Sequence, residues 1–189
     1  MMRMSKLTVT MIALVCGMTT AQAATEVVAQ PVVAEARPVV TEKLLADTYV
    51  RLQKLSQGGL SVRNYQLAKA LAFIDEARRE FYMRNHSGIV FDFLESAQII
   101  ADALEKGTVI GTVNRQFETS EAVAPALWRR IERLKGAAMF ACNGDKVARA
   151  EVELLAAGND QYLLGWRAAV ARIQLAEQQL DLAEQVATC

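Results

Sequence analysis

Apolar residues recur with a helical period along most of this chain. The clearest run is "SVRNYQLAKALAFIDEARREFYMRN", residues 61–85, in which apolar side chains fall three or four positions apart. These side chains are Leu67, Leu71, Ile74, Ala77 and Phe81. The spacing places them on one face of an α-helix. The charged residues of the run are expected away from that face; they are Lys69, Asp75, Glu76 and Arg79.

The same period predicts further helices, over residues 42–55, 90–104, 125–134, 145–157 and 162–186. Turns with glycine are expected to end four of the helices, at residues 57–59, Gly107, Gly136 and Gly158. Trp128 and Trp166 fall on apolar faces near helix starts, so we expect them in the core. Sustained strand alternation is missing from the sequence. We therefore predict an all-α fold of five or six amphipathic helices in antiparallel hairpins.

Two of the predicted hairpins resemble each other weakly. "AKALAFIDEA" before "GIVFDFLESAQIIADAL" parallels "ARAEVELLAA" before "GWRAAVARIQLAEQQL". Each joins two amphipathic helices through a polar turn, as tetratricopeptide-like repeats do, although the residues of the tetratricopeptide pattern are not matched. We describe the fold as loosely tetratricopeptide-like; a chance likeness between alanine-rich helices is the alternative.

The chain's one histidine, His86, lies between two predicted helices. Asn85, Ser87 and Gly88 surround it and are typical turn residues. Catalysis would need a nucleophile or carboxylate brought next to the imidazole by the fold. We therefore predict a structural role in a turn for His86 and Gly88.

Other patterns that carry chemistry are weaker. Two carboxylate pairs stand at short spacing, Asp92 with Glu95 and Glu151 with Glu153, and solvated helix faces carry such pairs routinely. The sequence has no glycine-rich phosphate loop, no Gly-x-Ser-x-Gly and no His-Glu-x-x-His. Its cysteines and distant histidine match no metal-ligand spacing. We expect no enzyme activity, no metal and no cofactor.

The first 23 residues have the three parts of a secretory signal peptide. Residues 1–6 are basic, residues 7–18 are apolar and uncharged, and Ala-Gln-Ala follows, with cleavage expected after Ala23. Lipidation at Cys16 is the alternative, and it fits less well because Val15 is not small. The apolar run is shorter than the ~20 residues that span a bilayer. No later stretch is long and apolar enough for a membrane span.

Residues 24–41 are rich in Ala, Val and Pro and show no period. Pro31 and Pro38 prevent a continuous helix, so we predict a flexible tether here. Docking of its valines onto the domain is the alternative. Residues 42–189 are then expected to form a single helical domain.

The net charge argues against nucleic-acid binding, and the cysteines favour a disulfide. The chain has 21 basic and 21 acidic residues, and losing Arg3 and Lys6 with the signal peptide leaves a net charge near −2. Nucleic acids need a concentrated basic face, so we expect no nucleic-acid binding. In an oxidising compartment, Cys142 and Cys189 favour one disulfide, and two free thiols are the alternative. A disulfide that closes a loop between these two positions stabilises a fold by about 4 kcal/mol in chain-entropy estimates.

Four segments then carry a resemblance to a known family. They are "YQLAKALAFIDEARREFYMRNHSGIVFDFLESAQIIADALEKG", "APALWRRIERLKG", "ACNGDKVARAEVELLAAGND" and "GWRAAVARIQLAEQ". Residues 65–189 resemble the helical N-terminal region that precedes the peptidoglycan-binding domain in some proteobacterial OmpA-family envelope proteins. The resemblance implies a periplasmic or outer-membrane-associated helical module. The OmpA-like domain is missing before the last residue, Cys189, so peptidoglycan binding is not implied.

We expect a non-enzymatic interaction or scaffold protein of the cell envelope, with an envelope protein of unknown identity as its partner. The connection at residues 108–123 and the concave side of the hairpins are the expected binding faces. A carrier that holds a small apolar ligand between its helices is the alternative.

Overall fold

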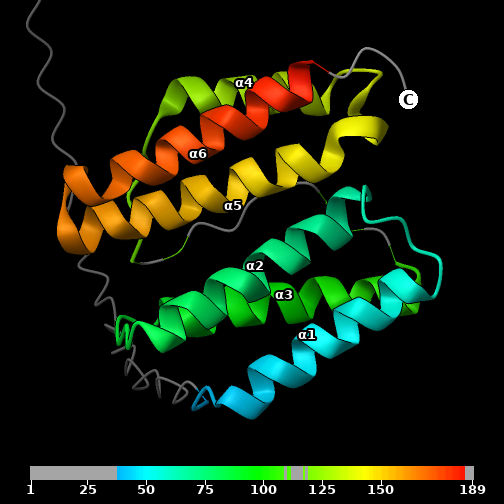
Figure 1. Cartoon of the computed structure of the whole chain (residues 1–189), viewed down its shortest axis with the longest axis horizontal. Helices are drawn as coiled ribbons and strands as arrows, with labels where there is room; N and C mark the ends of the chain where they lie inside the picture. The colour runs from blue at the N-terminus through cyan, green and yellow to red at the C-terminus, as the bar shows by residue number, and fades with distance from the viewer. Residues whose placement is uncertain (1–37, 109, 112–116, 118, 186–189) are drawn as a thin grey trace, which may run out of the picture. The chain divides into compact units, whose positions relative to one another are not determined.

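The computed structural model describes residues 38–108, 110–111, 117 and 119–185. Over these residues the chain forms six helices (Figure 1): α1 Glu42–Gln57, α2 Tyr65–Tyr82, α3 Ile89–Lys106, α4 Pro125–Lys135, α5 Phe140–Leu164 and α6 Trp166–Glu184. The predicted all-α fold is confirmed. The predicted signal peptide, most of the predicted tether and Cys189 lie outside the described residues.

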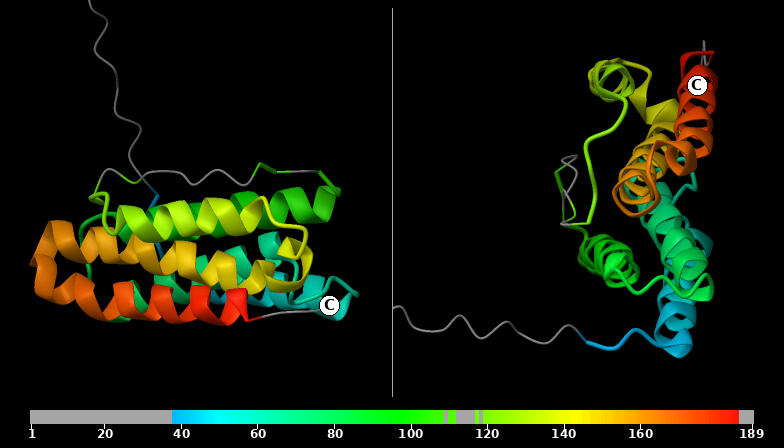
Figure 2. Two further views of the ribbon diagram at one scale, coloured as in Figure 1. Left: turned by 90° about the horizontal axis from the view of Figure 1, so that it is seen from above. Right: turned by 90° about the vertical axis from the view of Figure 1, so that its left-hand side faces the viewer.

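The helices are arranged around the contact between α2 and α5. Helices α1, α2, α5 and α6 lie side by side, and α3 and α4 cover one face of this row (Figure 2). Helices α2 and α3 form one antiparallel hairpin, and α5 and α6 form the other (Figure 1). The predicted hairpins are therefore present, while the tetratricopeptide-like detail stays a prediction.

Helix starts follow the capping chemistry of the sequence. Thr41 Oγ1 accepts a hydrogen bond from Leu44 N at 3.2 Å at the start of α1. Asn64 Oδ1 accepts from the first backbone N–H groups of α2. Such caps satisfy donors that have no partner inside the helix. Gly88 precedes α3 with φ 88°, a left-handed conformation that favours glycine, and its predicted place in the turn is confirmed.

Two main apolar clusters meet at the α2–α5 contact. One is built from α1, α2 and α3 with the α5 residues Val152, Leu155 and Ala156. The other is built from α4, α5 and α6 with Tyr65 and Ala68 of α2. Since α2 and α5 contribute to both clusters, burial of apolar surface ties the two hairpins together.

Two expectations about the core are wrong. Gly158 was expected to end a helix, but it is buried inside α5, which continues to Leu164. The chain before α4 packs on Gly158 within this helix, where Glu121 N donates to Gly158 O at 3.1 Å. Trp166 was expected in the core, but its side chain is 57% exposed. Trp128 is half-buried and packs against both clusters, in agreement with its predicted core position.

The predicted tether at residues 24–41 and the connection at residues 108–123 both contribute to the core where the structure describes them. Val40 is half-buried against the first cluster, so the alternative that a valine of the tether docks on the domain is confirmed at this position. Phe117 is buried, and its ring centroid lies 5.3 Å from that of Phe93. Val123 is also buried. The 108–123 connection, expected to form a binding face, is thus partly a packing element.

The close approach at Gly158 generates a first prediction. A Cβ atom there would lie 2.3 Å from Glu121 O and 2.3 Å from Ser120 Oγ. We expect Gly158→Ala to lower the free energy of unfolding by about 2 kcal/mol, because the connection must move away from α5. Urea denaturation measures the change. Gly136→Ala is the matched control, since its Cβ would meet nothing nearer than 3.6 Å, and it should stay within about 0.5 kcal/mol of the parent. Equal stability of the two variants would contradict the packing described.

Candidate interaction surface

A buried carboxylate lies at the centre of the α2–α5 contact. The side chain of Glu151 is 0% exposed and is held by three groups. Lys69 Nζ lies 3.0 Å from Glu151 Oε2, and Lys135 Nζ and the Tyr65 hydroxyl bind the same carboxylate. We call Glu151, Lys69, Lys135 and Tyr65 the Glu151 cluster. It joins α2, the end of α4 and α5 through charge-assisted hydrogen bonds.

The sequence placed Lys69 and Glu151 on solvated helix faces, and this was wrong. Glu151 continues the apolar stripe of α5 one turn after Val147, whereas Lys69 lies away from the predicted stripe of α2, one turn from the buried Phe73. For Glu151, its place within an apolar stripe was the available signal that it has a buried partner. Burial lowers the pKa of Lys69, while the charge of Glu151 opposes that shift.

The groups of the Glu151 cluster bind one another. A lowered amine pKa suits a nucleophilic lysine. Here the amine is held by Glu151 and by the Tyr65 hydroxyl, which lies 2.9 Å from Lys69 Nζ. The hollow beside Lys69 has a volume of about 110 Å³, well below the ~300 Å³ of small ligand pockets.

A second charged cluster surrounds Arg172 of α6. Its guanidinium lies 2.6 Å from Glu76 Oε2, 2.7 Å from Glu153 Oε2 and 3.0 Å from Asp160 Oδ2, with Glu80 at 3.7 Å. Arg172 is buried, so one cation from α6 ties carboxylates of α2 to carboxylates of α5. We call these five residues, together with Arg79, the Arg172 cluster.

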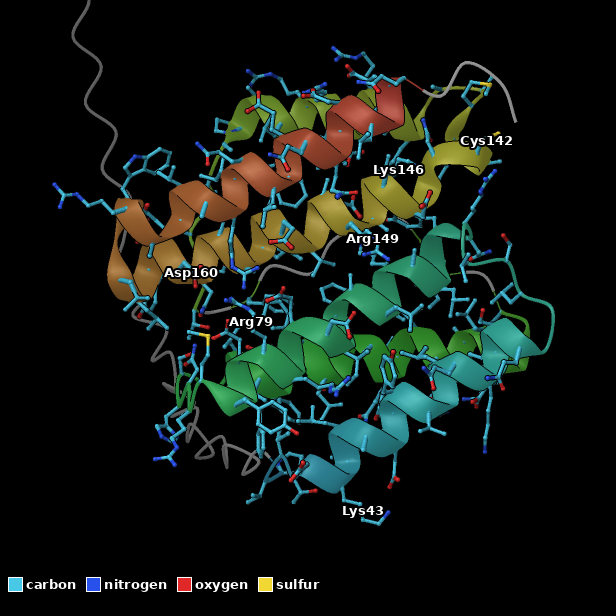
Figure 3. All side chains as sticks on the ribbon, in the orientation of Figure 1. Lys43, Arg79, Cys142, Lys146, Arg149 and Asp160 are labelled. Atoms are coloured by element: carbon cyan, nitrogen blue, oxygen red, sulfur yellow. The ribbon has the colours of Figure 1, made fainter. Side chains whose placement is uncertain are left out.

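Acidic side chains outnumber basic ones in the Arg172 cluster. Arg79 adds a second cation, 3.0 Å from Glu76, and lies with Asp160 at the adjoining ends of α2 and α5 (Figure 3). Burial and the charge of Glu76 raise the pKa of Glu153 to about 7. Burial also raises the pKa of Asp160 to about 6. The cluster therefore exchanges protons with solvent near neutral pH.

The Arg172 cluster positions two turns at one end of the helices. Asn85, in the α2–α3 turn, donates through Nδ2 to Glu80 Oε2 at 2.8 Å. Asp160 stands on the last turns of α5, just before the α5–α6 junction. Both turns lie at the left-hand side of Figure 1, and the view from above in Figure 2 agrees. We call residues 82–88 and 162–167 together the turn end.

The turn end exposes large apolar side chains. Six of the twelve large hydrophobic side chains exposed in the described chain belong to it: Tyr82, Met83, Tyr162, Leu163, Leu164 and Trp166. Leu164 is 71% exposed and Tyr162 54%. Exposed apolar side chains gathered in one place mark interaction sites, whereas scattered ones need no explanation. This surface was not predicted from the sequence, because Trp166 was expected in the core.

A hollow of about 650 Å³ lies beside the α2–α3 turn. Its apolar walls include Val40, Phe81 and Phe91, and Arg84 and His86 also line it. His86 is exposed in the turn, as the sequence predicted. The volume lies within the ~300–1,000 Å³ of small-molecule sites. Within the described residues, no group of His, Cys, Asp and Glu could hold a metal ion.

The other predicted carboxylate pair lies elsewhere. Asp92 is buried in the first turn of α3, so its expected solvated position was wrong, while Glu95 is half-buried. An acidic side chain in a first turn is favoured by the helix dipole. The structure brings neither residue into the two charged clusters or the turn end.

The chain matches no protein-family model, and comparisons with curated proteins and with solved structures find no match. The resemblance to OmpA-family envelope proteins therefore stays a prediction. No helix in the described part of the chain is long and apolar enough to cross a membrane.

The Glu151 cluster generates a second prediction. We expect Glu151→Gln to lower the free energy of unfolding by about 3 kcal/mol or more, because two ammonium groups lose their buried counter-charge. Glu132→Gln is the matched control: Glu132 also binds Lys135, at 3.0 Å, but its side chain is 66% exposed. Its loss should cost at most about 1 kcal/mol. Urea denaturation of both variants makes the comparison, and similar losses would contradict a dominant role for the buried carboxylate.

The Arg172 cluster generates a third prediction, on pH. Glu153 and Asp160 bind their protons more tightly when folded, since their pKa values rise from 4.5 and 3.8. Their contribution to stability is full below about pH 4 and is lost as pH rises through 6 to 7. We expect the free energy of unfolding to fall by on the order of 2 kcal/mol between about pH 5 and 8. Urea titrations at low salt measure this slope.

Glu153→Gln removes one surplus carboxylate without changing its shape. This variant should flatten the pH dependence and gain stability relative to the parent at pH 8. A stability that rises with pH in the parent chain would contradict the protonated cluster.

Proposed function

We propose that this chain is a non-enzymatic interaction or scaffold module of the cell envelope. The observation that carries the proposal is the turn end. There, apolar side chains of two hairpin turns are exposed at the same end of the helices, beside buried ion pairs. Keeping such side chains out of the core is unfavourable unless a partner covers them. A rigid helical base would lower the entropy lost on binding.

The site chemistry supports a binding role. The buried charged groups of the Glu151 and Arg172 clusters are engaged with one another and join helices. His86 contributes to an open hollow, and its neighbours on that wall are Arg84 and Asn85. Acid–base or nucleophilic catalysis would need a reactive group next to a substrate-sized site.

We also propose export. A basic start, an apolar run and Ala-Gln-Ala support cleavage after Ala23 and a periplasmic or outer-membrane-associated location. A disulfide between Cys142 and Cys189 would suit that oxidising compartment. Cys142 is buried near the start of α5, at the end of the helix away from the turn end (Figure 3). The bridge would hold the last residues near this helix.

A carrier of a small ligand is the second candidate function. The hollow beside the α2–α3 turn has a suitable volume and apolar walls with Arg84 and His86 among them. Such a site would suit an apolar molecule with an anionic end. A stoichiometric small molecule extracted from the purified chain would favour this function.

The proposed function generates a fourth prediction. We expect crosslinking in the native cells, followed by capture of the chain and mass spectrometry, to recover a specific envelope component. Leu164→Ser should abolish the recovery, because it removes the most exposed side chain of the α5–α6 turn. Val62→Ser is the matched control: Val62 is 60% exposed, in the turn before α2 at the opposite end of that helix. Recovery that survives Leu164→Ser, or no recovery at all, would contradict the proposal.

A further inference from the structure

We infer that the turn end docks on the interface of an anionic lipid bilayer, inserting the α5–α6 turn among the headgroups. This inference rests on the proposed function and names the partner of that surface. It concerns shallow attachment, since the described helices include no membrane span. Three features carry it: residue types, charge, and the size and shape of the surface.

The residue types at the α5–α6 turn are those of a membrane interface. Leu163 and Leu164 stand between Tyr162 and Trp166 in sequence, and all four side chains are exposed. Tyrosine and tryptophan favour the headgroup region because each has an apolar ring and a polar group, while leucine favours the acyl chains just below. The backbone at this turn is also partly satisfied, since Gly165 N donates to Gln161 O at 3.0 Å.

The exposed charges of the turn end are basic. Arg84 and Arg167 are exposed, one in each turn, and His86 lies beside Arg84. Acidic neighbours are engaged: Glu80 and Asp160 pair with Arg172, and Glu42 accepts the Tyr82 hydroxyl at 2.8 Å. A basic rim around apolar side chains complements anionic headgroups.

The size and shape of the surface favour a bilayer over a second copy of the chain. The four apolar side chains at the α5–α6 turn present on the order of 400 Å², since one large side chain contributes at most about 150–250 Å². A standard protein interface covers ~800 Å² on each partner. The side chains are exposed at the closed end of a helical hairpin. A bilayer interface accepts such a tip without a matching surface.

The chain's two tryptophans allow a direct test, because Trp166 belongs to the turn end and Trp128 is half-buried. The full chain with Trp128→Phe reports on Trp166 alone, and the full chain with Trp166→Phe reports on Trp128. Each is mixed with phosphatidylcholine vesicles that contain phosphatidylglycerol, with or without bromine on the acyl chains. We expect a blue shift of Trp166 emission and strong quenching by brominated lipid, with little change for Trp128. Quenching needs proximity to bromine, so attachment through the N-terminal residues alone would not mimic this result.

Charge is tested in the same assay. Arg84→Gln combined with Arg167→Gln should weaken binding to phosphatidylglycerol vesicles by about tenfold or more. Each arginine near an anionic surface contributes about fivefold to the affinity. Arg63→Gln is the control, since Arg63 is exposed before α2, at the other end of the hairpin. Circular dichroism confirms that each variant is folded.

Three outcomes would overturn the inference. Unquenched Trp166 on vesicles that carry the chain would show attachment through another part. Self-association that depends on Leu164, without a vesicle effect, would assign the surface to a second copy. A captured protein partner together with unquenched Trp166 would leave the interaction-module function standing and remove the lipid as its partner.

Discussion

The arrangement of this protein depends on the pairing of charges that water cannot reach. Glu151 lies at the contact of α2 and α5, and Lys69, Lys135 and Tyr65 hold its carboxylate. A buried carboxylate without such partners would be very unfavourable, so few registers of the helices are compatible with it. Apolar burial brings the helices together, and the charge pairing selects how they align. Buried ion pairs often contribute more to such selection than to net stability.

The same principle extends from the core to the proposed binding surface. Arg172 links α6 to carboxylates of α2 and α5 at one end of the molecule. Glu80, which also pairs with Arg172, accepts a hydrogen bond from Asn85 in the α2–α3 turn. Both hairpin turns are therefore fixed to one charged base. Since Glu153 and Asp160 have raised pKa values, protonation at that base is coupled to folding.

Helical periodicity was enough to predict most of the fold. The apolar stripes predicted the helices. Residue types that favour helix ends predicted several of their limits correctly, including Pro125 at the start of α4 and Gly107 at the end of α3. Gly158 was misjudged because its role depends on Glu121 and Ser120, which are distant in sequence. Glycine commonly ends helices. Here its missing side chain lets residues 120–121 pack closely against α5, and the helix continues.

The site was harder to predict, because it depends on partners that only the fold brings together. Lys69 and Glu76 lie away from the predicted apolar stripe of α2, and the partners that bury them lie on α5 and α6. Trp166 has the helical spacing of the buried residues Ala169 and Ala176, but it is the first residue of α6, and spacing does not show whether a neighbour covers the end of a helix. Its exposure therefore could not be derived from spacing alone.

We infer that the Arg172 cluster sets the geometry of the turn end. The most direct measurement is the distance distribution between two spin labels, one at Met83 and one at Leu163, attached through genetically encoded side chains so that the cysteines are untouched. Pulsed electron paramagnetic resonance should show one narrow distribution in the parent chain. It should become broad in Arg172→Met, in a variant that circular dichroism shows to be folded. A distribution that is broad in the parent, or equally narrow in the folded variant, would contradict the claim.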